Sequence, residues 1–169
     1  MAFLLIYLSK LTRMRFFIVS FFTILMSNSI LAQSQLMEAY SYNQLIINEQ
    51  SKIGSEAFYF IKKVDSLNLR ILQFQIKKSI KVVENAKVFK DEIEFQQAAI
   101  ELFKHYLETS ETIYPELIKI VEDPELEYKD FKVKKEALTK KAAASDKIAN
   151  DKFVIVQEKF AKKYGIKLE

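Results

Sequence analysis

Hydrophobic residues recur along most of the chain at alternating spacings of three and four, the period of an α-helix that packs on one side. Over 34–65 this pattern marks one continuous face. Its members are Leu36, Tyr40, Asn43, Ile47, Gln50, Gly54, Ala57, Ile61 and Val64. Ile46, Ile53 and Phe60 widen the apolar face, as a core-facing bundle helix requires. The pattern therefore predicts a first helix over 34–65.

A second stripe predicts a helix that ends at about Lys87, with Asn68 as its N-cap. The stripe consists of Leu69, Leu72, Ile76, Ile80 and Val83. After a short connection, Asp91 and Glu94 stand three residues apart, which is the spacing of a capping box at the start of a third helix. The third stripe consists of Phe95, Ala99, Leu102, Tyr106, Ile113, Leu117 and Ile120.

Two prolines interrupt the second half of the chain. Pro115 lies inside the third stripe, where it removes a backbone donor and predicts a kink near 111–115. The pair at 123–124 marks the next boundary, because proline suits the first turn of a helix. The last helix is expected to begin between 125 and 131 and to end at Tyr164, with Gly165 as a left-handed cap.

Four amphipathic helices with short connections pack most simply as an all-α, antiparallel, up-down-up-down four-helix bundle. The expected domain is a single one over 33–169. Only two glycines and two prolines occur in the 169 residues, which disfavours a fold with many turns. The helices are unequal in length, so one end of the bundle is expected to be an extended helical pair.

The N-terminus has the pattern of a secretory signal peptide over 1–32. Arg13 and Arg15 precede an apolar run over 16–26, and small residues lead to a predicted cut after Ala32. The run is too short for a comfortable membrane span. Met14 is an alternative start, and an uncleaved anchor is the alternative to cleavage. The chain is thus predicted to be exported, to the periplasm or the cell surface.

Charge and composition exclude several classes of function. Residues 1–32 contain three basic residues and no acidic one, so 23 basic residues face 22 acidic ones in the remainder. The basic isoelectric point is therefore no sign of nucleic-acid binding. The absence of cysteine excludes disulfides, thiolate metal sites and thiol catalysis.

No catalytic or cofactor motif is present, and we expect neither an enzyme, a bound cofactor nor a metal. With glycine only at 54 and 165, none of the glycine-rich phosphate or nucleophile motifs is possible. His105 is the single histidine, and Leu102 stands where a Glu-x-x-His metal motif would need its carboxylate. The simplest interpretation is a histidine at the helix surface or at the boundary of the core.

Asn43 and Gln50 interrupt the first stripe seven residues apart, on one face of the helix. Buried amides must find hydrogen-bond partners. They indicate a polar ligand pocket between helices, which Tyr106 would join, or register control between helices, or solvation at the bundle edge. Gly54 indicates a close approach of the first and last helices or, alternatively, room for a ligand.

A lysine-rich segment covers 128–141, with six lysines against two acidic residues. It is interpreted as a solvated helix face, or alternatively as a patch for phosphate, anionic lipid or an envelope polymer.

Three runs carry a family resemblance: 42–50 (YNQLIINEQ), 98–103 (AAIELF) and 160–166 (FAKKYGI). On these runs the mature chain resembles a family of small exported bacterial surface proteins, which are helical bundles without an assigned activity. We expect a non-enzymatic protein of the cell envelope that acts through protein or envelope contacts. The alternative is a bundle that binds or senses a small ligand. The sequence does not define the partner or the oligomeric state.

Overall fold

The computed structural model of the chain describes residues 33–168, and the predicted signal peptide at 1–32 lies outside this range. An N-terminal helix covers 33–62. It is followed by α2 (Ser66–Asn85), α3 (Ile93–Thr112), α4 (Tyr114–Glu122) and α5 (Tyr128–Tyr164). Only Ile113 separates α3 from α4, so these two helices form one broken rod. None of the described helices is long and apolar enough to cross a bilayer.

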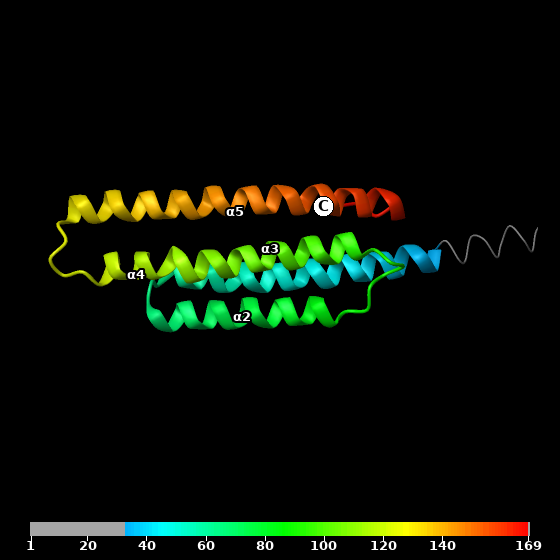
Figure 1. Cartoon of the computed structure of the whole chain (residues 1–169), viewed down its shortest axis with the longest axis horizontal. Helices are drawn as coiled ribbons and strands as arrows, with labels where there is room; N and C mark the ends of the chain where they lie inside the picture. Colours follow the sequence, from blue (N-terminus) through cyan, green and yellow to red (C-terminus); the bar gives the residue numbers. More distant parts are fainter. Residues whose placement is uncertain (1–32, 169) are drawn as a thin grey trace, which may run out of the picture.

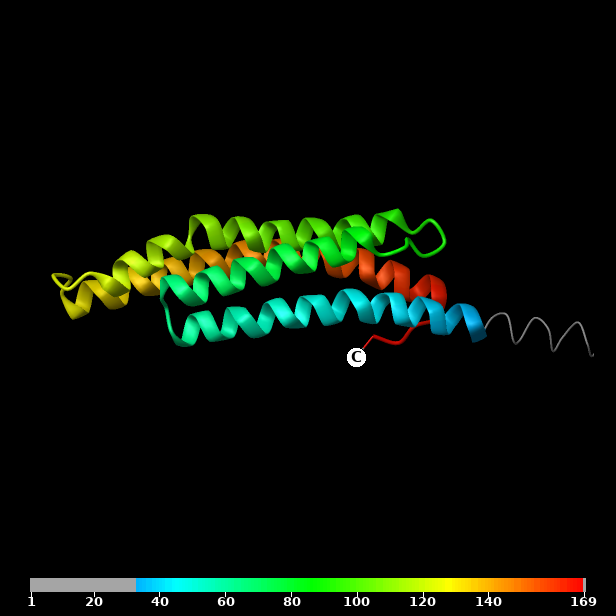
Figure 2. The same ribbon diagram turned by 90° about the horizontal axis from the view of Figure 1, so that it is seen from below.

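The four rods run up, down, up and down, as the sequence predicts (Figure 1). In both views, α4 and the beginning of α5 extend beyond the turn that joins the N-terminal helix to α2 (Figures 1 and 2). This overhang is the extended helical pair that the unequal helix lengths predict. The described part of the chain is an all-α four-helix bundle.

The core is formed by the predicted stripe of α2, whose five apolar members are all buried, together with one face of each other rod. Phe60, Phe95 and Phe103 are the largest side chains with almost no exposed surface. Near the end where α5 finishes, the ring of Phe95 stacks on those of Phe153 and Phe160, with centroids 5.8 Å and 4.5 Å apart. Such aromatic contacts add to the apolar burial that holds the bundle together without disulfides.

The buried face of the N-terminal helix is rotated by about one residue from the predicted face. Its buried residues are Ala39, Tyr42, Asn43, Ile46, Glu49, Ile53 and Phe60, whereas Tyr40 and Ile61 are exposed. The prediction for this face is confirmed for Asn43, Ile46, Ile53 and Phe60 and wrong for Tyr40 and Ile61, because the helix carries apolar residues on two sides. Glu49 is only 5% exposed, and its Oε2 accepts a hydrogen bond of 2.8 Å from Ser79 of α2. That bond, together with the Lys52 ammonium, satisfies the buried carboxylate.

Two predicted helix caps differ from the structure. Asp65, and not Asn68, is the N-cap of α2; its Oδ1 accepts from the Asn68 backbone N–H at 2.8 Å. Asp91 does not cap α3, because it lies before the cap with a positive φ of 64°. The N-cap there is Glu92, which makes no capping bond from its side chain. The cap at Gly165 is confirmed, with φ 70° and a bond from its N–H to the Ala161 carbonyl.

Pro115 produces a break at the position where the sequence predicts a kink. It occupies the first turn of α4, where a missing N–H costs nothing, and the rod resumes after Ile113. Just before the break, the Ser110 carbonyl accepts a hydrogen bond of 3.0 Å from the Gln73 side chain. An α2 side chain thereby supports the interrupted rod.

Two amide pairs join the N-terminal helix to α5. Gln157 donates to Asn43 at 2.9 Å, and Gln50 donates to Asn150 at 3.1 Å. The two pairs are seven residues apart on each helix, in opposite chain directions. They fix the antiparallel register of the first and last helices, because a slip would leave the buried Asn43 and Gln157 amides and the partly buried Gln50 and Asn150 amides without partners.

The Asn43–Gln157 pair predicts a strong coupling in stability. Replacing Asn43 by Leu leaves the buried Gln157 amide unpaired and is expected to lower the free energy of unfolding by about 2 kcal/mol. Replacing Gln157 by Leu as well should recover at least half of that loss. Urea denaturation of the single and double variants measures this coupling.

Asn48→Leu is the matched control, because Asn48 is exposed on the same helix. A change at this site is expected to shift stability by less than about 0.5 kcal/mol. Additive losses in the two core variants would show that the amide pair does not act as a unit.

Candidate functional site

A half-enclosed cavity of about 290 Å³ lies between the helices of the bundle. Every helix contributes to its wall. The lining residues are Gln50, Ile53, Gly54, Ala57, Leu72, Ile76, Tyr106, Tyr114 and Asp146. An apolar wall with a few converging polar groups is the usual make-up of a small-molecule site.

Two of the three residues that the sequence selects as pocket candidates meet at this cavity. Gln50 and Tyr106 line it from the N-terminal helix and α3. Asn43 does not line it; it is 3% exposed and its oxygen is occupied by Gln157. Asn43 therefore fits the alternative that the sequence left open, in which a buried amide controls helix register. Binding at the cavity stays a prediction.

The cavity wall also includes two polar residues that were not among the pocket candidates from the sequence. Tyr114 lies beside the Pro115 break, and Asp146 lies on α5, whose apolar stripe is weak. Burial raises the pKa of Asp146, against hydrogen bonds from Thr109 and His105 that favour its charged form. Burial and the Asp146 charge also raise the pKa values of Tyr106 and Tyr114, that of Tyr114 to about 12.

Next to Asp146 lies a group that contains the residue types of a hydrolase triad. His105 Nε2 is 3.1 Å from Ser145 Oγ and 3.4 Å from Asp146 Oδ1. In a triad, serine and carboxylate contact opposite nitrogens of the imidazole, so that the carboxylate can orient the base. Here both contact the same nitrogen, and this geometry does not build a triad.

His105 is half-buried in this group, with 25% of its side chain exposed. It contacts α5 through Ser145 and Asp146, which agrees with the boundary position that the sequence allows. Within residues 33–168, no cluster of three or more His, Asp or Glu side chains could hold a metal ion.

A second feature is an exposed apolar area near the turn between the N-terminal helix and α2, which we name the hairpin surface. Its six members are between 42% and 69% exposed: Phe58, Tyr59, Ile61, Leu67, Ile71 and Phe74. The three α2 members follow spacings of four and three, on the side of the helix opposite its buried stripe. Rows of exposed apolar side chains such as that of α2 mark interaction surfaces.

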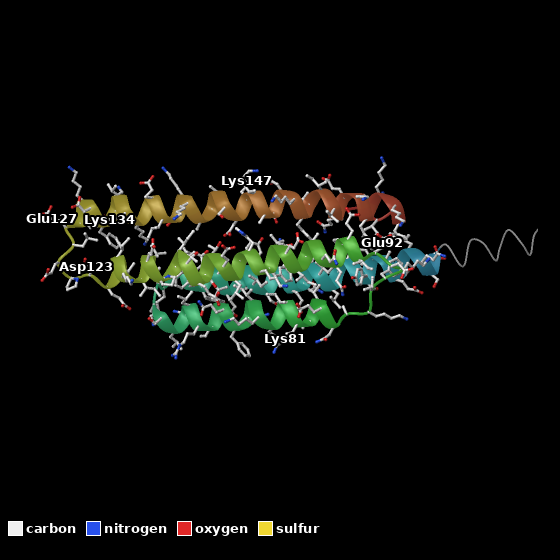
Figure 3. All side chains as sticks on the ribbon, in the orientation of Figure 1. Lys81, Glu92, Asp123, Glu127, Lys134 and Lys147 are labelled. Carbon is white, nitrogen blue, oxygen red and sulfur yellow. The ribbon has the colours of Figure 1, made fainter. Side chains whose placement is uncertain are left out.

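The lysine-rich segment at the beginning of α5 lies close to an acidic one. Residues 116–127, in α4 and the following loop, contain five acidic residues and a single lysine. Lys134 lies at the same end of the molecule as Asp123 and Glu127 (Figure 3). The local positive charge is therefore offset nearby, which favours a solvated helix face over an anion-binding patch.

No family model, curated protein or solved structure matches the chain.

The raised pKa of Tyr114 predicts alkaline behaviour. A tyrosine whose folded pKa exceeds its unfolded value contributes stability below pH 10, and this is lost as the pH rises towards 12. The contribution of Tyr114 to the free energy of unfolding is expected to be no more than about 2 kcal/mol, since part of the ring faces solvent. Ultraviolet absorbance titration should show one tyrosine that ionises at about pH 12.

Tyr114→Phe should remove this late transition and flatten the loss of stability between pH 10 and 12. Tyr128→Phe, which alters a side chain that is 79% exposed, should leave the late transition in place. A late transition that persists in Tyr114→Phe would place the buried phenol elsewhere.

Proposed function

We propose that the protein is an exported, non-enzymatic helical bundle that attaches to an anionic envelope membrane through the hairpin surface. One observation carries this proposal: exposed apolar side chains and excess positive charge coincide on the same two helices. The export pattern at 1–32 supports it, because that pattern would deliver the chain to the envelope.

The charge around the hairpin surface is strongly one-sided. Residues 58–81 hold six basic residues and a single acidic one, although the chain from 33 onward is nearly balanced. Asp65, the acidic residue, is paired with Lys63 and caps α2. Lys77 is paired with Glu111 of α3. The other basic side chains, Lys62, Arg70, Lys78 and Lys81, give this end a positive field, which attracts anionic lipid.

On the outer face of α2, the apolar side chains and the lysines occupy different parts of the helix. Leu67, Ile71 and Phe74 occupy its first half, and Lys78 and Lys81 continue the same stripe. Lys81 projects away from the bundle (Figure 3). Interfacial helices combine apolar insertion with lysines whose stems lie along the apolar region and whose ammonium groups reach headgroups.

The outward, helical form of this face favours a flat membrane over a protein groove. The apolar side chains stand on the outside of two helices, and each exposes at least 42% of its surface. Shallow insertion of such side chains into the headgroup region buries apolar area without unfolding the bundle.

Sedimentation with lipid vesicles tests the proposal, using the chain from residue 33. Vesicles with about one third phosphatidylglycerol should bind it, and pure phosphatidylcholine vesicles should bind it at least about tenfold more weakly. Ile71→Ser combined with Phe74→Ser should weaken binding by about tenfold or more, since two inserting side chains are lost. Lys78→Glu with Lys81→Glu should remove the preference for anionic lipid.

The control pair is Ile148→Ser with Ile155→Ser, two α5 residues that are 61% and 66% exposed. This pair should bind vesicles like the unchanged chain. Equal losses in both pairs, or no binding to anionic vesicles at all, would rule out attachment through the hairpin surface.

A further inference from the structure

Gly54 leaves part of the cavity wall open. It lies in the middle of the N-terminal helix, where glycine costs about 1 kcal/mol relative to alanine. A Cβ at this position would meet no packing partner within 4 Å. The expectation that Gly54 allows a close helix approach is therefore wrong, and the missing side chain instead adds to the space beside Gln50 and Ile53.

Asp146 lines this cavity, and its hydrogen bonds within the described residues are made by one carboxylate oxygen. Thr109 Oγ1 donates to its Oδ1 at 3.1 Å, and His105 Nε2 lies 3.4 Å from the same oxygen. Among the described residues, no hydrogen bond is made to Oδ2. The side chain is 28% exposed and lines the cavity, so Oδ2 is available to accept from a bound molecule.

The other polar groups of the cavity are neutral. The lining includes the Gln50 amide and the hydroxyls of Tyr106 and Tyr114, and no lysine, arginine or histidine. The single fixed charge of the wall is thus negative. An anionic ligand would meet Asp146 with no lysine or arginine in the wall to compensate its charge, whereas an ammonium group would form a charge-assisted hydrogen bond to it.

The rest of the cavity wall determines the shape and polarity of the ligand that fits. Ile53, Leu72 and Ile76 are aliphatic and buried, and they line the cavity together with Tyr106 and Tyr114. Aromatic rings also attract a nearby cation through their π-faces. The volume of about 290 Å³ lies at the lower end of the range for ligand pockets, which limits the ligand to a small one.

We infer that this cavity binds a small organic amine. The ammonium group pairs with Asp146 Oδ2, and the apolar body packs against Leu72 and Ile76 of α2 and against the rings of Tyr106 and Tyr114. The inference is independent of membrane attachment, since it concerns the interior of the bundle. The burial that raises the pKa of Asp146 agrees with it, because a bound ammonium would stabilise the charged carboxylate.

The test uses three probes of similar shape and different charge, added to the isotope-labelled chain from residue 33. These are 2-phenylethylammonium, neutral 2-phenylethanol and anionic 3-phenylpropionate. In nuclear magnetic resonance spectra, the ammonium probe should produce saturable shifts of the Gln50 side-chain amide and the Gly54 backbone amide. Its affinity should exceed that of the anion by about tenfold or more, the equivalent of one buried charge pair.

Two variants with matched controls locate the site. Asp146→Asn should reduce ammonium binding to the level of the alcohol, whereas Asp151→Asn, an exposed change on the same helix, should leave it unchanged. Gly54→Leu should fill the open wall and abolish binding of all three probes. Gly54→Ala adds only the Cβ, which has room, and should preserve binding.

Three results would overturn the inference: no saturable shift with the ammonium probe, equal affinity for the ammonium and carboxylate probes, or unchanged ammonium binding in Asp146→Asn. Circular dichroism of each variant separates loss of the site from loss of the fold. Because vesicles are absent from this experiment, its failure leaves membrane attachment as a separate question.

Discussion

The fold depends on the contact between its first and last helices, which lie more than a hundred residues apart in the chain. Two amide pairs set this contact, Asn43 with Gln157 and Gln50 with Asn150. Apolar side chains alone tolerate a small slip of one helix along another. A buried amide does not, because the slip would break its hydrogen bond and leave it without a partner. In a chain without cysteine, these directional bonds select one register, and apolar burial supplies most of the stability.

The cavity follows from this register and from the break at Pro115. The register places α5 so that Asp146 reaches the same space as Gln50 and Gly54 of the N-terminal helix. The break restarts the rod at Tyr114 and directs this ring to the cavity. The Gln73 bond to the Ser110 carbonyl secures the end of α3 beside it. The break between α3 and α4 therefore forms part of the cavity wall. An unbroken helix would place a different set of side chains there.

Sequence reasoning predicts the parts of this fold that depend on local chemistry. The α2 stripe, the boundaries at the two prolines and the cap at Gly165 follow from periodicity and from the backbone preferences of proline and glycine. The rotation of the N-terminal helix does not, because apolar residues lie on two of its sides. The burial of Glu49 depends on Ser79, thirty residues away, which no local pattern reveals. For the cavity, Gln50 and Tyr106 interrupt apolar stripes and are visible in the sequence, whereas Asp146 lies on a helix rich in charge and resembles any solvated residue there.

The cavity and the hairpin surface occupy neighbouring turns of the N-terminal helix. Gly54 and Ala57 line the cavity, and Phe58 and Tyr59 follow at once on the exposed side. The charges of the two features are opposite: a carboxylate lies inside and lysines surround the outside. An anionic membrane attracts the lysines, and it also concentrates small organic cations in the layer of water next to it. A bundle attached there would present a carboxylate-lined cavity in the region where amines are most abundant, so the two proposed interactions are compatible in their chemistry although each rests on separate residues.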